Sequence, residues 1–326
     1  MFFKKCLRTL ALVLVIMPLN TLAIPTSLIA GGENIGIQIS LNGVAIAGTY
    51  EINGKNPAID AGLKVGDVIT SINGTKINSI DEMVNIINNS NSKVEIGFMR
   101  KEKSMKTNLE LINVDGVIKT GLYVKDSITG IGTLSFIDPD TKKFGALGHE
   151  ITSKNTNYLL EIKDGKIFES SVTRIDRSEA GTPGAKNANF YTNNVLGNVS
   201  LNTTKGIFGT YTDILQNKKE YKVADNDEIE LGSAKILTVT SGNEVKEYSI
   251  NILKLNNDNS TNKNILFEIT DEELLSLTGG VVQGMSGSPI IQNDYIVGVV
   301  NYVIVDSPER GYGVFITNML EKMESE

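Results

Sequence analysis

One serine in this chain stands in a sequence context that suits a nucleophile. Residues 284–289 read Gly-Met-Ser-Gly-Ser-Pro and lead directly into an apolar strand. The glycines let the backbone turn tightly around Ser286, so that the N–H groups of Gly284 and Ser286 can converge and bind an oxyanion. This pattern predicts acyl transfer, with Ser286 as the nucleophile and with Gly284 and Ser286 forming the oxyanion hole. Ser288 needs no chemical role.

A serine nucleophile needs a base within hydrogen-bond reach, and the chain contains one histidine. His149 lies in segment 145–150, Gly-Ala-Leu-Gly-His-Glu, far enough upstream of Ser286 for most of a barrel to separate them. A lone histidine is more often a loop or core residue. Because His149 follows a glycine and accompanies the serine loop, we interpret it as the general base.

The elements that must position these residues are strands. Short apolar runs separated by Gly, Asn and Asp recur from residue 113 to residue 326, which predicts a mainly β domain of one or two barrels. The serine loop resembles that of chymotrypsin-like serine proteases, so we expect a chymotrypsin-like β-barrel peptidase domain over 113–326. The Asn-rich segment 256–264 predicts a mobile surface loop.

Residues 31–112 form a separate α+β unit. Asn42-Gly43 between two alternating apolar stretches predicts a β-hairpin. The pair Ser79 and Glu82 forms a capping box that predicts the start of a helix.

The same unit resembles a PDZ domain of the form common in bacterial proteases. The residues that carry the resemblance are Ala-Gly-Leu-Lys-Val-Gly-Asp-Val-Ile at 61–69 and Ile-Asn-Gly at 72–74. PDZ domains capture an extended peptide as an added strand and hold its carboxylate at a glycine-containing loop. The resemblance places this peptide-binding site at Ile35, Gly36 and Ile37.

The first 30 residues predict a signal or membrane-anchor segment. Basic residues precede an apolar run from Leu10 to Leu19, which is long enough for a secretory signal but short for a membrane-spanning helix. It could still act as an uncleaved anchor. The only cysteine, Cys6, lies in this segment, so the chain can form no internal disulfide.

Composition excludes several classes of function. The chain has 326 residues, a net charge of −7 and no basic stripe, which argues against nucleic-acid binding. One His and one Cys cannot supply the ligands of a zinc site. We expect neither a metal nor a cofactor, since acyl transfer by Ser and His needs none.

The chain as a whole resembles the SpoIVB peptidase family, the sporulation serine proteases of endospore-forming Firmicutes. Segments 145–151, 278–292 and 310–316 carry the resemblance, as does the order of membrane segment, PDZ domain and peptidase. The resemblance makes His149 the base and Ser286 the nucleophile. It points to Asp271 as the acid, although Asp271 is nearly as well explained as a helix N-cap.

Three features of the sequence leave the assignment of the catalytic site incomplete. Asp176 and Asp164 are weaker rivals for the acid. Met285 stands where trypsin-like zymogens carry an Asp, so their activation by a new N-terminus is closed to this chain. Asn301-Tyr302 replaces a Thr-His pair that the family often carries after the serine loop.

The expected function is therefore that of an exported or membrane-tethered serine endopeptidase. The resemblance implies that it cleaves a membrane-associated regulator between the forespore and mother-cell membranes, triggers mother-cell sigma-factor processing, and cleaves itself. Its partners would be this protein substrate, peptide termini bound by the PDZ domain, and the membrane. The alternatives are an HtrA-like quality-control protease, in which PDZ domains follow the catalytic domain, and a non-catalytic PDZ scaffold.

Overall fold

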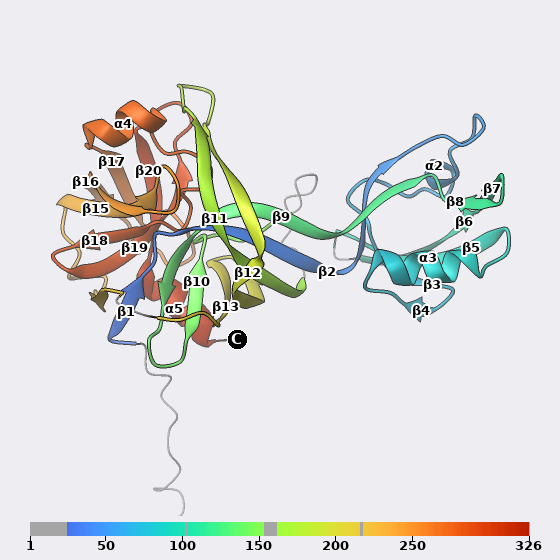
Figure 1. Ribbon diagram of the computed structural model, residues 1–326, viewed down its shortest axis with the longest axis horizontal. Coiled ribbons are helices and arrows are strands. Elements are labelled where there is room, and N and C mark those ends of the chain that lie inside the picture. The colour runs from blue at the N-terminus through green and yellow to red at the C-terminus, as the bar shows by residue number, and fades with distance from the viewer. Residues whose placement is uncertain (1–24, 102, 153–161, 216–217, 326) are drawn as a thin grey trace, which may run out of the picture.

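The computed structural model describes residues 25–101, 103–152, 162–215 and 218–325. They form two lobes, and two long strands run from one lobe into the other (Figure 1). The larger lobe is rich in strands, and the smaller lobe surrounds the helix α3.

Six antiparallel strands close a first barrel in the larger lobe. Each strand pairs with the next, and the last pairs with the first. In this order they are β2 (Asn34–Thr49), β9 (Leu122–Ile137), β10 (Lys143–Ala146), β13 (Gly206–Tyr211), β12 (Ala185–Thr203) and β11 (Ile162–Asp176). Isoleucines at alternate positions of β2, including Ile35, Ile37 and Ile39, point into its core because side chains alternate between the two faces of a strand.

A second ring of six antiparallel strands forms the other barrel. They are β15 (Gly232–Val239), β16 (Val245–Leu255), β17 (Ile265–Ile269), β20 (Arg310–Phe315), β19 (Tyr295–Val303) and β18 (Pro289–Gln292). Tyr248, Phe267 and Phe315 are among the large side chains that fill its core. The helix α4 (Glu272–Thr278) begins at the N-cap Asp271, as the sequence predicts.

Two short strands and the last helix connect the barrels. β1 (Ser27–Ala30) pairs with β9 and with β14 (Glu220–Val223), and β14 pairs in turn with β19 of the second barrel. The helix α5 (Ile316–Glu324) buries Met319, Leu320 and Met323 against this junction. The predicted mainly β, chymotrypsin-like fold is thereby confirmed. Of the two predicted alternatives, one barrel or two, the structure has two.

The smaller lobe is the predicted PDZ domain. Its core gathers apolar side chains from the helix α3 and from the strands around it, including Ile72, Met83 and Phe98. Its elements are α2 (Pro57–Asp60), β3 (Val68–Ile72), β4 (Thr75–Lys76), α3 (Ile80–Asn88), β5 (Lys93–Arg100), β6 (Lys103–Glu110), β7 (Ile112–Val114) and β8 (Val117–Lys119).

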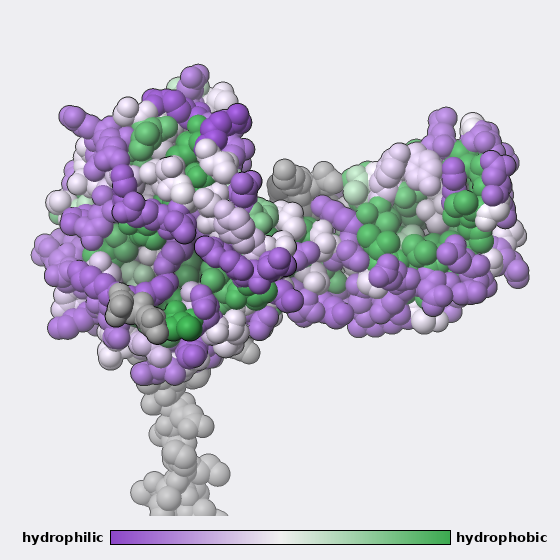
Figure 2. Space-filling model, in the orientation of Figure 1, coloured by the Kyte–Doolittle hydropathy of each residue, from purple (hydrophilic) through white to green (hydrophobic). Residues whose placement is uncertain are grey.

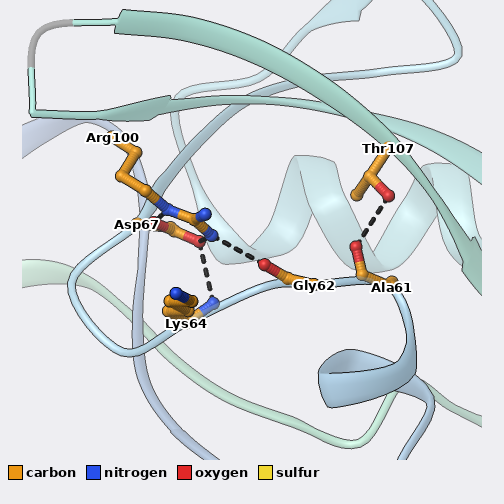
Figure 3. Close-up of polar contacts among 6 residues, drawn as sticks. All are labelled: Ala61, Gly62, Lys64, Asp67, Arg100 and Thr107. Atoms are coloured by element: carbon orange, nitrogen blue, oxygen red, sulfur yellow. Dashed lines mark hydrogen bonds and ion pairs between the residues drawn. The ribbon is translucent and has the colours of Figure 1, made fainter.

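The shape of the loop at 61–67 depends on one buried carboxylate. Asp67 accepts a hydrogen bond from the Lys64 N–H at 2.8 Å and pairs through both oxygens with Arg100 at 2.7 and 2.6 Å (Figure 3). Arg100 also donates to the Gly62 carbonyl at 2.7 Å. A bidentate pair of this kind fixes both the loop and the end of β5, which explains why the motif contains an aspartate.

The PDZ domain is inserted into the first barrel. The sequence predicts that it spans 31–112, but Ile35–Ser40 pair with β9 and with β11 of the barrel. The domain occupies the connection between β2 and β9, which stay paired with each other from the barrel into the smaller lobe (Figure 1).

The predicted hairpin at Asn42-Gly43 is wrong. The chain continues through these residues as the single strand β2. Gly43 has a φ of +136°, and a Cβ there would lie 2.5 Å from the carbonyl oxygen of Ile69. This glycine is required by close approach to β3, rather than by a turn.

The predicted leader lies almost wholly outside the described residues. Within them, no helix is both long and apolar enough to span a membrane. Residues 27–33 belong to the barrel, since β1 is paired on both sides and the Gly31 and Gly32 N–H groups donate to β9.

Candidate active site

Thr133 at the barrel end of β9 holds the serine loop in place. Its N–H donates to the Ser286 carbonyl at 3.0 Å, and its hydroxyl donates to the Gly284 carbonyl at 2.8 Å. Its own carbonyl accepts from the Leu147 N–H at 3.4 Å, in the loop that carries His149. One fully buried threonine therefore connects the two loops that the sequence assigns to catalysis.

The two predicted oxyanion donors are left without protein acceptors among the described residues. The carbonyl of Gln283 accepts from Lys186, and the carbonyl of Met285 accepts from Ser288. Because C=O and N–H point in opposite directions across a trans peptide, these bonds turn the N–H groups of Gly284 and Ser286 the other way. Gly284 has a φ of +96°, which favours glycine there.

The loop before the imidazole has an unusual backbone. Leu147 has a φ of +72°, and the N–H of Gly148 donates to the Ala146 carbonyl at 3.0 Å, which closes a tight three-residue turn. The buried amide of Asn301 donates to the Gly148 carbonyl at 3.0 Å and supports this turn. A strained, non-glycine residue two positions before His149 fits the tendency of strain to collect at functional sites.

His149 is oriented by a main-chain group. Its Nδ1 lies 2.8 Å from the carbonyl oxygen of Glu150. A carbonyl can only accept, so the neutral ring carries its proton on Nδ1 and leaves Nε2 free as a base. Tyr302 stacks on the ring with a centroid distance of 5.7 Å. Burial lowers the pKa of His149 below its ordinary value of 6.5, which keeps the base neutral at pH 7.

His149 and Ser286 line the same cavity, of about 440 Å³. In this structure the Ser286 hydroxyl donates to the Asn301 carbonyl at 2.9 Å. Apolar side chains form much of the wall; they are Ile37, Ile128, Ile131, Leu147, Ile151, Val281, Val282 and Val303. The structure thus brings together the predicted base, nucleophile and oxyanion donors.

Asp271, the predicted acid, does not line this cavity. Its Oδ1 accepts from the Leu274 N–H at 3.0 Å and its Oδ2 from the Ser249 N–H at 3.3 Å. One oxygen therefore caps the start of α4, and the other binds the backbone of β16. Asp176 is bound to Arg174 and Asn187, and Asp164 lies in β11; neither lines the cavity.

The predicted PDZ peptide site at Ile35, Gly36 and Ile37 is contradicted by the structure. These residues lie in the barrel, where β2 pairs with β9 on one side and with β11 on the other, so their backbone has no free edge for a peptide. Gly36 is explained by packing, because a Cβ there would lie 2.9 Å from the ring of Phe190.

A free edge does exist in the smaller lobe. Among the described residues, the part of β9 from Leu122 to Gly132 pairs with β2 alone. The helix α3 lies beside it, and the Ile80 N–H donates to Asp126 of β9 at 2.9 Å. Val84 of α3 is 47% exposed, and apolar surface shows on this side of the lobe in Figure 2.

The Asn-rich segment 256–264 is a surface loop, but many hydrogen bonds tie it to the barrels. Lys205 donates to the carbonyls of Asn259 and Thr261 at 2.9 and 2.8 Å, and Asn264 donates to the Asn256 carbonyl at 2.9 Å. The loop lines an open cleft of about 740 Å³ that also includes Glu150 and Tyr302, beside the catalytic cavity.

Sequence reasoning missed Thr133, Asn301 as a support, and the carbonyl of Glu150. A threonine within a strand and a backbone carbonyl carry no sequence signal of their own. Among the described residues there is no cluster of three or more His, Cys, Asp or Glu that could hold a metal ion.

Several known proteins are similar to parts of this chain. A probable periplasmic serine endoprotease DegP-like of Bartonella henselae is 32% identical over 27% of this chain and 22% of its own length. A probable periplasmic serine protease do/HhoA-like of Haemophilus influenzae is 33% identical over 43% of this chain and 31% of its own. The chain thus spans less than a third of either relative.

Two solved protease structures also align with parts of the chain. The active form of the Rv3671c protease from M. tuberculosis is 15% identical, with 60% of this chain and 73% of that chain covered and a TM-score of 0.34. The HtrA-type protease AlgW with a decapeptide is 9% identical, with 93% and 64% covered and a TM-score of 0.36.

Two family models match the chain along most of its length. The PDZ domain model covers residues 34–111, and the model of the SpoIVB peptidase S55 covers residues 116–320, well over half of the chain. Because the SpoIVB model alone covers more than half of the chain, this serine peptidase belongs to the SpoIVB peptidase S55 family.

Proposed function

We propose that this serine peptidase is a signalling endopeptidase of sporulation. It acts in the space between the forespore and mother-cell membranes, where it cleaves a membrane-associated regulator and so triggers sigma-factor processing in the mother cell. Membership of the SpoIVB family supports this role. The observation that carries the chemistry is the shared cavity of His149 and Ser286 below two unpaired N–H groups.

In this mechanism Ser286 must first leave its hydrogen bond to the Asn301 carbonyl and turn toward His149. Its Oγ then attacks the carbonyl carbon of the scissile peptide, while Nε2 of His149 takes the proton. The N–H groups of Gly284 and Ser286 bind the oxygen as it becomes negative. The imidazolium next protonates the leaving amine, and water hydrolyses the acyl-enzyme by the same steps.

The Glu150 carbonyl takes the orienting position that an aspartate holds in the usual triad. It accepts from Nδ1 of His149 and so fixes the tautomer. A carbonyl carries only a partial charge, so it stabilises the imidazolium less than a carboxylate would. The apolar wall of the cavity favours a substrate with apolar side chains next to the cleaved bond.

The PDZ domain provides a second contact with protein partners. We place its peptide along the free edge of β9 between Leu122 and Ile128, beside α3. This choice rests on the unpaired edge, which β-augmentation requires, and on the exposed apolar side chain of Val84 in α3. This position replaces the one that the sequence suggests.

A quality-control protease of the HtrA kind is the second candidate, because relatives of that kind match parts of the chain. The insertion of the PDZ domain before most of the catalytic barrels favours the signalling role. A scaffold without catalysis is disfavoured by the intact base, nucleophile and oxyanion donors.

The catalytic assignment predicts a graded set of activities. Ser286→Ala and His149→Ala should each abolish peptide cleavage and, for Ser286→Ala, labelling by a fluorophosphonate, because nucleophile and base act as one unit. Asp271→Asn should keep turnover within about threefold and Asp271→Ala should cost about 1 kcal/mol of stability, as expected for a helix cap. A loss on the order of 10⁴ in kcat for folded Asp271→Asn would instead make Asp271 the triad acid.

The lowered pKa of His149 predicts the pH dependence. The base works above its pKa, so the acid limb of kcat/KM should have its midpoint below 6.5. Tyr302→Ala uncovers the ring and lets water solvate the imidazolium, which should raise the midpoint toward 6.5 and reduce kcat/KM at pH 6. Tyr302→Phe keeps the stacked ring and serves as the control. An acid limb that does not move in Tyr302→Ala contradicts this account.

The peptide site in the PDZ domain predicts a local effect of charge. Val84→Glu should weaken binding of a peptide selected from a random C-terminal library by at least about tenfold, because a bound peptide would bury the new carboxylate against apolar side chains, which is costly. Val65→Glu is the matched control, since Val65 is 43% exposed on the same lobe but lies in the loop at 61–67 rather than in α3. Equal affinities for both variants, measured by fluorescence anisotropy on the full chain, would place the peptide elsewhere.

Residues 1–30 are proposed to tether the enzyme until a self-cut releases it. The cut should fall before Ser27, because residues 27–33 are built into the barrel. N-terminal sequencing should find a shortened wild type and an uncut Ser286→Ala. Identical shortening of both proteins would assign the cut to a signal peptidase, and a new N-terminus after Ser27 would contradict the position.

A further inference from the structure

A buried lysine lies behind the oxyanion loop and has no role in the mechanism above. Lys186, near the start of β12, is 3% exposed. Its N–H donates to the Gln283 carbonyl at 2.9 Å, and the Gln283 N–H donates to Gly184 at 2.8 Å. The residue next to Lys186 also pairs with Gln283. The backbone around Lys186 thus orients the peptide that joins Gln283 to Gly284.

The stem of the same side chain packs against the glycine of the oxyanion hole. A Cβ placed on Gly284 would lie 3.2 to 3.3 Å from three carbons of Lys186. The loop therefore rests on the methylene groups of Lys186, and it can approach them this closely because residue 284 is glycine.

The amine end reaches the other side of the nucleophile. Nζ of Lys186 donates to the Thr238 hydroxyl oxygen at 2.9 Å, and the Ser288 hydroxyl donates to the same oxygen at 3.0 Å. Thr238 and Ser288 are fully buried. One side chain therefore contacts the loop at residue 284 and, through Thr238, at residue 288, on both sides of Ser286.

This arrangement is costly to the fold. Among the described residues, no carboxylate pairs with Lys186, and burial lowers its pKa to about 7. A buried amine with one hydrogen bond normally gives way to an apolar side chain of similar size. Met285, between the two contacts, is itself fully buried and supplies no charge to balance the amine.

We propose that Lys186 is a positioning residue for the oxyanion hole. It holds Gly284 from behind and ties residue 288 through Thr238, so that the N–H groups of Gly284 and Ser286 keep their orientation during acyl transfer. It thereby takes over, from behind the loop, the support that trypsin-like enzymes obtain from an ion pair at the position of Met285. This inference rests on the proposed peptidase role of Ser286.

The first variant removes the amine of Lys186 and keeps an unbranched apolar side chain of similar length. Lys186→Met should lower kcat on a peptide substrate by about tenfold to a hundredfold, less than the roughly 10²–10³ lost with a whole oxyanion donor, and should leave KM within about threefold. Inhibition by a peptide boronate, whose oxygen occupies the oxyanion hole, should weaken by the same factor. The melting temperature should stay the same or rise, because a buried unpaired charge has been removed.

Two further variants complete the test. Thr238→Val keeps the shape and removes the hydroxyl that joins Lys186 to Ser288, so it should also lower kcat with little change in KM. Lys235→Met removes an exposed amine from the same strand as Thr238 and should leave kcat and KM unchanged.

The outcomes distinguish a failure of the proposed peptidase function from a failure of the inference about Lys186. Labelling of the wild-type protein by a fluorophosphonate shows that its serine nucleophile is active. A wild-type protein that does not react would contradict the proposed function itself. With an active wild type, unchanged kcat in folded Lys186→Met overturns the inference. If Lys186→Met does not fold, Thr238→Val decides: a lowered kcat supports the role of the network, and wild-type kcat in the folded variant overturns it.

Discussion

The antiparallel pairing of β2 with β9 is the interaction on which both lobes depend. The two strands pair from Asn34 and Thr133 in the barrel to Thr49 and Leu122 in the PDZ domain. In the barrel they close the ring of strands, and in the smaller lobe they contribute Val44, Ile46 and Leu122 to the PDZ core. Neither core could form in its present shape if this ladder shifted, because a shift of one residue would turn every side chain to the opposite face.

The same ladder ends at the catalytic loops. Thr133 is the last residue of β9 that pairs with β2, and it binds both the serine loop and the loop of His149. Gly287 is required there, since any side chain would collide with the Thr133 carbonyl and the Leu147 N–H. The position of the nucleophile relative to its base is therefore set by the backbone and side-chain contacts of Thr133 with both loops, rather than by a direct bond between Ser286 and His149.

Several elements of the fold and of the candidate site could be predicted from the sequence, because neighbouring residues determine their local structure. The helix that begins after Ser79 and the cap at Asp271 follow from side chains that bind their own backbone, and both are present. The alternating isoleucines of β2 predict a strand. Ser286 and its glycines predict the oxyanion loop because only that residue pattern permits so tight a turn.

The predictions from sequence fail where the local structure is determined by a contact with a distant part of the chain. Gly36 and Gly43 are signals of a loop or a turn when they are read alone, yet each is needed because another part of the chain approaches closely: Phe190 in one case and β3 in the other. The orienting group of His149 could not be predicted at all, because every residue has a carbonyl and only the folded structure shows that the one of Glu150 lies next to Nδ1. The cost of burying Lys186 is likewise visible only once the barrels are closed.

The insertion also limits how the two lobes can move. A domain attached by a single linker can rotate freely, but this PDZ domain is held by two strands that stay paired over about 36 Å, taking ~3.3 Å for each residue from Leu122 to Thr133. The ladder has a large irregularity between Ser40 and Ala45, where four residues of β2 face Asp126 alone. Pairing is regular on the barrel side, and one smaller irregularity lies on the other side between Ile46 and Gly48, so a change in the angle between the lobes is absorbed most easily at these two points. Because Asp126 also binds the first turn of α3, the larger bulge lies beside the helix next to which we place the peptide.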